Sequence, residues 1–351
     1  MEKDRKRALL WALLALVIAA LTIWAVFARS GDLSPAEVFA SLRDASPFWL
    51  GATLLCMVGF IVLEGLALLC ILRHLGCRGG FFRGLHFSAA DQFFSAITPS
   101  ATGGQPATAL IMSRRQIPGG VITTTLILNL VMYTAATLTV GIVGLAVRPE
   151  AFLCLTGLGR ALVALGLAGL TVMTLLFLGL LKKGKLLYHL GVRLFWLLHR
   201  LRLMRDPEKW SRRLEHTTEE FGDCARAMGG KPGALAAVYL LDLGQRIAQI
   251  TVTLTLHCAM GGSPGKTGID LWVAQALAQI GSYCVPIPGG MGAADFLMLD
   301  GFRRLLAEEY AYELQILSRC FSFYVCTLLS GLIVLAGVLA ARFAAGKEKA
   351  R

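Results

Sequence analysis

The sequence predicts an all-α polytopic membrane protein with six full transmembrane helices and two re-entrant helical hairpins, arranged as an inverted 3+3 repeat. Of its 351 residues, 56% are hydrophobic and only 16% are charged, whereas about a quarter of the residues in a soluble domain are charged. Several apolar stretches reach the roughly 20 residues needed to cross the hydrocarbon core. Two Pro/Gly-rich motifs interrupt other apolar regions, and non-helical backbone survives at membrane depth only where protein buries it or where it lines a wet cavity.

Six apolar segments are expected to cross the membrane as full helices. They lie at approximately 8–28, 48–72, 119–147, 153–181, 233–259 and 313–341. The first segment follows a basic N-terminal stretch, as the apolar core of a signal peptide would. It is bulky throughout and lacks a small-residue cleavage site, so we interpret it as an uncleaved anchor.

Two further apolar regions, 85–117 and 270–306, are each interrupted by a Pro/Gly-rich motif. The motif residues are Pro99, Gly103, Gly104 and Pro106 in the first region and Pro286, Pro288, Gly289, Gly290 and Gly292 in the second. Proline stops a helix, and glycine allows positive φ and close backbone approach. An arm of ~14 residues rises only about 21 Å as a helix. Each region is therefore expected to form a re-entrant hairpin, and two ordinary loops that contain Pro and Gly are the alternative.

The distribution of basic residues predicts the orientation in the membrane. The net charge is +12. With the N-terminus inside, 25 of the 34 Lys and Arg residues fall on the cytoplasmic side, six fall outside and three lie within spans. Because cytoplasmic loops carry an excess of Lys and Arg, we expect a multi-pass protein of the cell membrane with both termini in the cytoplasm.

This topology divides the chain into two membrane repeats, 1–147 and 148–342, and a cytoplasmic tail at 343–351. Each repeat holds three crossings and one hairpin, and because three is odd, the repeats must be inverted relative to each other. Inverted repeats whose broken helices meet near the midplane are typical of secondary transporters. The second repeat also carries a basic insert at 182–231 that is rich in Leu, Phe and Trp. Such an insert suits a helix in the headgroup region of an anionic leaflet, and a solvated connector is the alternative.

Ionisable residues inside the membrane are costly and therefore mark candidate functional positions. Asp242 and Arg246 lie one turn apart on one helix face, which favours either an internal ion pair or a polar track for a charged or zwitterionic lipid headgroup. Asp295 follows the second motif in the first turn of a helical arm, where it could cap the helix or pair with Arg319. The other candidate substrate-binding residues are Glu64, Asp91 and Gln105.

No pattern in the sequence indicates a catalytic, metal or cofactor site. The nine cysteines lie mostly in apolar runs without a C-x-x-C motif, and the six histidines do not cluster, so we expect no metal and no cofactor. The segment 261–267 resembles a nucleotide-binding P-loop, but its glycine spacing is one residue short and no strand precedes it. We therefore assign no catalytic residue.

The motifs Thr98-Pro-Ser-Ala-Thr-Gly-Gly-Gln-Pro106 and Pro286-Ile-Pro-Gly-Gly-Met-Gly-Ala-Ala-Asp295 resemble those of the transmembrane, flippase-like region of the lysylphosphatidylglycerol synthase family. The resemblance covers roughly residues 8–342. In that family the second motif commonly carries Glu where this chain has Asp295, which keeps the charge but shortens its reach.

Full-length members of that family combine two parts, which sets the functional expectation. A membrane region moves aminoacylated phosphatidylglycerol between leaflets, and a C-terminal cytosolic domain aminoacylates the lipid from aminoacyl-tRNA. Because this chain ends at Arg351, the resemblance implies a stand-alone lipid-translocation module without the aminoacyltransferase part.

Three functional hypotheses follow from these features. The favoured one is a lipid flippase that moves an anionic or aminoacylated membrane phospholipid through a polar cleft lined by Asp242, Arg246, Asp295 and Arg319. The alternatives are a phosphatidylglycerol lysyltransferase that uses lysyl-tRNA and a membrane scaffold for a separate synthase. Under the favoured hypothesis we expect no nucleic-acid partner. A separate soluble synthase as a partner and the formation of a homo-oligomer both remain open.

Overall fold

The computed structural model describes residues 42–98, 102–182, 219–283 and 292–348, together with Arg193 and Trp196. All regular structure in these residues is helical, which confirms the all-α class. The expected first span at 8–28, most of the 182–231 insert and parts of both Pro/Gly motifs lie outside the described residues.

Four helical stretches of the described chain are long and apolar enough to cross a membrane. They are α3 (Pro47–His74), α6 (Gly119–Val147), residues Gly157–Gly179 of α8 (Gly157–Lys182) and a run from Glu308 to Leu339. That run comprises α14 (Glu308–Arg319), the π-helical turn η3 (Cys320–Val325) and the first part of α15 (Cys326–Glu348). The four stretches coincide with the spans expected at 48–72, 119–147, 153–181 and 313–341.

The start of α8 differs from the prediction, because a short helix, α7 (Pro149–Leu153), precedes it. Between the two helices, the backbone N–H and the hydroxyl of Thr156 donate to Asp300 Oδ2 at 2.9 and 2.8 Å. The Thr156 hydroxyl oxygen in turn accepts the N–H of Gly159 at 3.2 Å. Threonine in this position satisfies a free N–H group at the start of a helix, so α8 begins after Thr156 rather than at 153.

The helix α11 (Pro232–Ala259) has the length of the span expected at 233–259 and packs against α3, α6, α12 and α14. It is not one of the four apolar stretches. The reason is its polar content, since Asp242, Gln245 and Arg246 lie within it, and all three are buried. Polar side chains in a membrane helix normally face the bundle interior, so the neighbouring helices, rather than lipid, surround the polar face of α11.

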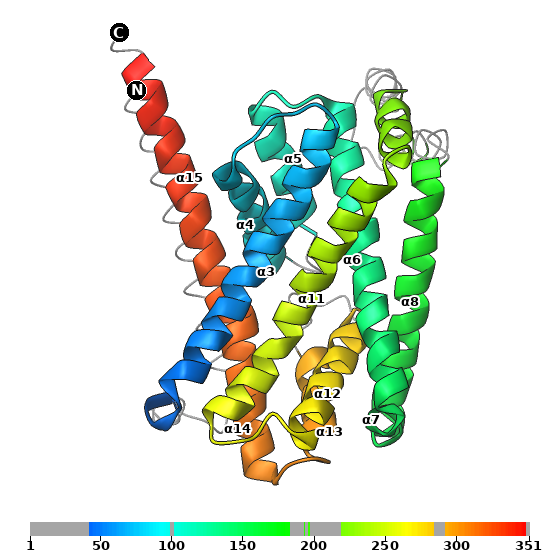
Figure 1. Cartoon of the computed structure of the whole chain (residues 1–351), viewed down its shortest axis with the longest axis vertical. Coiled ribbons are helices and arrows are strands. Elements are labelled where there is room, and N and C mark those ends of the chain that lie inside the picture. The colour runs from blue at the N-terminus through cyan, green and yellow to red at the C-terminus, as the bar shows by residue number, and fades with distance from the viewer. Residues whose placement is uncertain are drawn as a thin grey trace.

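Each Pro/Gly motif separates a pair of short helices. The first broken pair is α4 (Phe81–Ile97) and α5 (Gly104–Arg114), and the second is α12 (Lys266–Ser282) and α13 (Ala293–Phe302). None of the four exceeds 17 residues, which is below the length of a full crossing. In Figure 1 the first broken pair lies beside the upper half of α3, whereas the second lies near the opposite end of the bundle.

The helices α3 and α4 approach each other closely at two glycines. A Cβ atom added at Gly65 would lie 2.9 Å from the carbonyl carbon of Gly84, and one added at Gly84 would lie 2.5 Å from the carbonyl oxygen of Gly65. Small residues at such a crossing let two membrane helices touch through their backbones. The contact also brings Glu64, the neighbour of Gly65, against the polar residues of α4.

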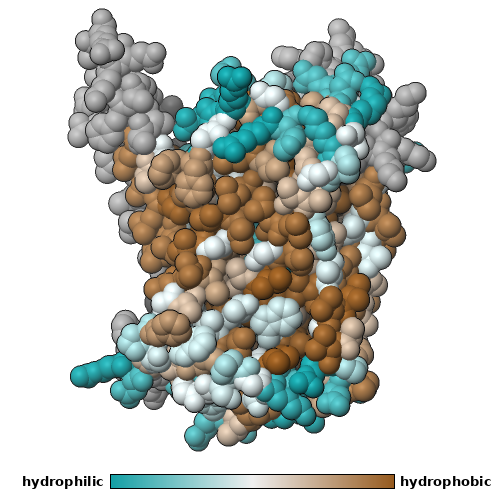
Figure 2. Space-filling model, in the orientation of Figure 1, coloured by the Kyte–Doolittle hydropathy of each residue, from teal (hydrophilic) through white to brown (hydrophobic). Residues whose placement is uncertain are grey.

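The surface matches a protein embedded in lipid. Figure 2 shows a brown hydrophobic band across the middle of the molecule, with hydrophilic residues gathered at the upper and lower ends. Large apolar side chains are exposed along the helices, and Leu158, Leu165, Val172 and Leu175 of α8 are each at least 60% exposed. Contiguous exposed apolar surface of this extent is unusual in soluble proteins, so a membrane location explains it.

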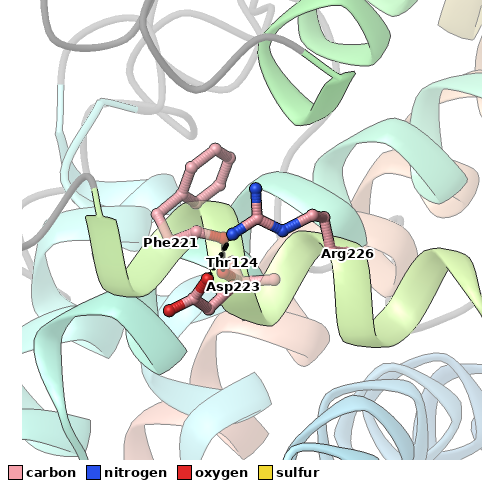
Figure 3. A network of polar contacts seen from close by, with 4 residues as sticks. All are labelled: Thr124, Phe221, Asp223 and Arg226. Atoms are coloured by element: carbon pink, nitrogen blue, oxygen red, sulfur yellow. Dashed lines mark hydrogen bonds and ion pairs between the residues drawn. The ribbon is translucent and has the colours of Figure 1, made fainter.

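A helical segment at 219–229, in the last part of the basic insert, docks on the start of α6. The carboxylate of Glu220 accepts the backbone N–H of Gly120 at 2.8 Å, a favourable position for a negative charge at a helix N-terminus. The hydroxyl of Thr124 lies 3.5 Å from the carbonyl oxygen of Phe221 (Figure 3). These contacts tie the end of the insert to the first repeat.

Candidate functional site

Polar side chains from several helices meet inside the bundle, around α3 and α11. We refer to them as the central polar cluster, which consists of Glu64, Ser88, Asp91, Gln92, Gln105, Tyr133, Asp242, Gln245, Arg246, Gln249 and Tyr283. They come from α3, α4, α5, α6 and α11, and Tyr283 follows α12 directly. Both broken pairs therefore contribute to one group of polar residues, whose centre is buried and whose edge is exposed at Tyr283.

Glu64 connects three of these helices. One carboxyl oxygen, Oε2, accepts hydrogen bonds from the hydroxyl of Ser88 at 3.0 Å and from the amides of Gln92 and Gln245 at 2.6 and 3.1 Å. The side chain is only 3% exposed. Since buried polar groups must be hydrogen-bonded to offset the loss of water, this carboxyl group fixes the positions of α4 and α11 relative to α3.

The first Pro/Gly motif reaches the cluster through Gln105. Its amide donates to Asp91 Oδ2 at 3.2 Å, and the carboxyl group of Asp91 lies within hydrogen-bonding reach of Glu64. The motif glycine Gly104 makes this approach feasible, because an added Cβ would lie 2.2 Å from Asp91 Oδ1 and 2.1 Å from the hydroxyl of Ser95. The predicted residues Glu64, Asp91 and Gln105 are thus neighbours in space.

Arg246 is the buried cation of the cluster and is 1% exposed. Its Nη1 donates to Gln249 Oε1 at 2.8 Å and to the hydroxyls of Tyr133 and Tyr283 at 3.2 and 3.5 Å. Its guanidinium carbon also lies 4.1 Å from the ring centre of Tyr133 and 5.0 Å from that of Phe60, within the range of a cation–π interaction. The hydroxyls of Tyr133 and Tyr283 are hydrogen-bonded to each other, which links the second broken pair to α6 and α11.

The ion pair between Asp242 and Arg246, one of the two alternatives that the sequence offers, is not formed. Asp242 is completely buried, and neither of its carboxyl oxygens has a hydrogen-bond partner among the described residues. The spacing of one turn allows the contact, but the guanidinium turns toward Tyr133 and Tyr283, where aromatic rings and hydroxyls surround it. Asp242 is therefore a buried carboxyl group without a partner in the part of the chain that the structure describes.

A second polar group lies at the end of the second motif, where Asp295 makes both of the contacts that the sequence offers as alternatives. Asp295 Oδ2 accepts the backbone N–H of Gly292 at 2.9 Å and so caps α13. Its Oδ1 accepts Arg319 Nε and the amide of Gln315, each at 3.0 Å. Gly292 has a φ of +83°, a conformation that side chains disfavour. The π-helical turn η3 starts directly after Arg319, and such turns occur frequently at functional sites.

The structure thus divides the predicted site residues into two groups. Glu64, Asp91, Gln105, Asp242 and Arg246 gather in the central polar cluster, whereas Asp295 and Arg319 form the capping group beside η3. The motif residues Pro99, Pro286, Pro288, Gly289 and Gly290 lie outside the described residues. Within the described chain no group of His, Cys, Asp or Glu could hold a metal ion.

Sequence reasoning missed Tyr133 and Tyr283, which complete the surroundings of Arg246. Both were indistinguishable from aromatic core residues, because each lies within or beside an apolar stretch. The available signal was the phenol itself, since a buried tyrosine hydroxyl needs a hydrogen-bond partner.

The centre of the central polar cluster is closed to solvent in this structure, whereas Tyr283 at its edge is 39% exposed. Glu64, Asp242, Gln245 and Arg246 are each no more than 3% exposed. An open pocket of about 470 Å³ lies elsewhere, at the ends of α3, α11 and α14, and its polar lining residues are Asp44, Ser46, Tyr310 and Glu313. The predicted cleft is thus not open at Asp242 and Arg246, because the surrounding helices pack over them.

The sequence is similar to that of a known protein family. The family model described as the lysylphosphatidylglycerol synthase TM region matches residues 12–330, a range that includes both motifs and every residue of the central polar cluster. The chain matches none of the curated proteins with which it was compared. Because the match extends over most of its length, the chain belongs to the lysylphosphatidylglycerol synthase transmembrane-region family.

Proposed function

We propose that this protein is a lipid flippase, which moves the headgroup of a phospholipid between leaflets past the central polar cluster while the acyl chains remain in lipid. One observation carries the proposal. Both broken pairs send polar side chains to the group of carboxyls around the buried Arg246. Broken helices that meet at a polar site near the midplane are the usual substrate site of secondary transporters.

The proposal includes an inverted arrangement of the two broken pairs. The first pair lies toward the end of the bundle where α3 ends and the second lies toward the end where α3 begins (Figure 1). We propose that they enter the membrane from opposite faces as re-entrant hairpins within six full spans, with the basic end in the cytoplasm of a multi-pass cell-membrane protein. The excess of Lys and Arg on that side supports this orientation.

The charges of the cluster indicate the headgroup chemistry. Arg246 can bind the phosphate that every phospholipid carries. The carboxyl groups of Glu64, Asp91 and Asp242 can bind an ammonium group, as in a zwitterionic or aminoacylated headgroup. Lysylphosphatidylglycerol has both features and is one such substrate. Because Arg246 is buried in this structure, the bundle must open before a headgroup reaches it.

A reconstitution experiment tests the function directly. The purified protein is placed in liposomes that contain a phospholipid with a fluorescent headgroup, and an impermeant reductant then bleaches the outer leaflet. Without any tRNA, the bleached fraction is expected to exceed the outer-leaflet share measured in protein-free liposomes. The matched control is Arg226→Ala, which removes an exposed arginine paired with Asp223 (Figure 3) and is expected to behave as the unmodified protein.

The same liposomes separate the alternatives. Formation of lysyl-lipid from lysyl-tRNA, without lipid movement, would replace the flippase proposal with the lysyltransferase. If the liposomes show neither lipid movement nor lysyl transfer, the flippase proposal is contradicted and a scaffold for a separate synthase is favoured.

A further inference from the structure

The central polar cluster holds more acidic groups than its one cation can balance. Three carboxyl groups, on Glu64, Asp91 and Asp242, lie in the same buried region as the single guanidinium of Arg246. They come from α3, α4 and α11. The other titratable groups facing them are the phenols of Tyr133 on α6 and Tyr283 after α12, and the thiol of Cys326 on α15.

The geometry restricts how many of these carboxyls can be ionised together. Two carboxyl groups within hydrogen-bonding reach, such as those of Glu64 and Asp91, cannot both be charged, because one must supply the hydrogen. Asp242 is fully buried, and neither of its oxygens accepts a hydrogen bond from the described residues. An ionised carboxylate in that position would be a buried charge without compensation. One negative charge is enough to balance Arg246, which leaves two carboxyls to carry protons while the site is closed.

We propose that Asp242 and the Glu64–Asp91 pair bind protons in the closed state and release them when the site opens to water, so that lipid movement is coupled to proton movement. The inference rests on the proposed flippase function and adds its energy source. Opening hydrates the carboxyls, which then give their protons to water on the side to which the site has opened. The ammonium of a bound headgroup balances the ionised carboxylates, so the loaded site closes without taking up protons. After the headgroup leaves on the other side, the carboxyls take up protons there before the empty site closes. Headgroup and protons thus move in opposite directions, and a pH difference between the two sides sets the favoured direction.

Asp242 is the group best placed to carry the exchanged proton. Glu64 keeps three hydrogen bonds that hold α3, α4 and α11 together, and Asp91 accepts one from Gln105. Asp242 has none of these restraints, and it lies one turn from Arg246 on α11, where a phosphate would bind. Its protonation can therefore change without breaking the packing of the helices.

A spectroscopic experiment tests proton binding independently of transport. The infrared spectrum of the purified protein in lipid nanodiscs is recorded near neutral pH, in the region where protonated carboxyl groups absorb. We expect a protonated-carboxyl band that is reduced in Asp242→Asn and retained in Asp223→Asn, a control that alters a carboxylate with a 74% exposed side chain. A band of equal intensity in the two variants, or no band in the unmodified protein, would overturn the assignment of Asp242.

A transport experiment tests the coupling itself. Liposomes loaded with a pH-sensitive dye carry the fluorescent phospholipid, and a pH difference of either sign is imposed. We expect the rate of lipid movement to change at least several-fold between the two signs, together with a change in internal pH, and we expect Asp242→Asn to lose this response. If the rate of lipid movement does not depend on the pH difference, the coupling is overturned and the flippase function stands. If no lipid moves at all, both the coupling and the flippase function are overturned. This result is distinguishable from lipid movement at a rate independent of the pH difference.

Discussion

Replacement of Arg246 by alanine is expected to abolish lipid movement while the protein still inserts into the membrane. The substitution removes the only arginine of the central polar cluster, with its hydrogen bonds to Gln249, Tyr133 and Tyr283. No cation then remains there to bind phosphate. Because a hydrogen bond to a charged group contributes about 1.5–3 kcal/mol, the melting temperature should fall as well. Lipid movement in liposomes and thermal unfolding in detergent are the two measurements.

The variant Arg246→Lys separates the loss of function from the loss of stability. Lysine keeps the positive charge, but it lacks the planar group that stacks on Tyr133 and that can bind phosphate with two parallel hydrogen bonds. We expect its melting temperature to lie closer to that of the unmodified protein, whereas lipid movement remains strongly reduced. The exposed Arg226→Ala is the control for the loss of an arginine. Full lipid movement in Arg246→Ala would show that Arg246 does not contact the substrate.

Replacement of Asp295 by alanine is the second change with a large expected effect. It removes the cap of α13 and the contacts to Arg319 and Gln315 in one step. Loss of a helix cap costs about 1 kcal/mol, and loss of the ion pair with Arg319 adds to that cost. Since these contacts hold the end of the second motif against α14, we expect lipid movement to be abolished.

The variant Asp295→Glu tests whether the carboxylate itself is what matters. Glutamate retains the charge with a longer side chain, so we expect it to recover the ion pair with Arg319 and most of the lipid movement. Asp223→Ala, which removes an exposed carboxylate, is the matched control. Unchanged transport in both Asp295→Ala and Arg246→Ala would refute the roles assigned to the two polar groups.

The sequence predicted those features that depend on local composition. The apolar spans at 48–72 and 119–147 reappear as α3 and α6, and helices end and restart at both Pro/Gly motifs. The cap of Asp295 and its ion pair with Arg319 were predicted as alternatives, because a helix start and a basic residue on the next span can be read from the chain, and both are formed. Local rules were sufficient here, since proline and glycine determine the backbone whatever surrounds them.

The surroundings of Arg246 could not be predicted in this way. The spacing of Asp242 and Arg246 indicates a contact on one helix, but the partners that attract the guanidinium are Tyr133 and Tyr283 on other helices. Only the packing of α6 and α12 against α11 brings them there. The low mean hydropathy of α11, taken by itself, argues against a membrane span. It is misleading because the polar face that lowers it is covered by protein.

The claim that the two broken pairs reach the central polar cluster from opposite faces of the membrane has a direct test. Single cysteines are introduced at four exposed basic positions that flank the broken pairs, in a background without reactive native cysteines. The positions are Arg78 and Arg114 around the first pair and Lys266 and Arg304 around the second. An impermeant maleimide is applied to sealed vesicles of each orientation. We predict that Arg78→Cys and Arg114→Cys react only from the cytoplasmic side and that Lys266→Cys and Arg304→Cys react only from the external side. If the two members of either pair react from opposite sides, that pair crosses the membrane and the inverted re-entrant arrangement is wrong.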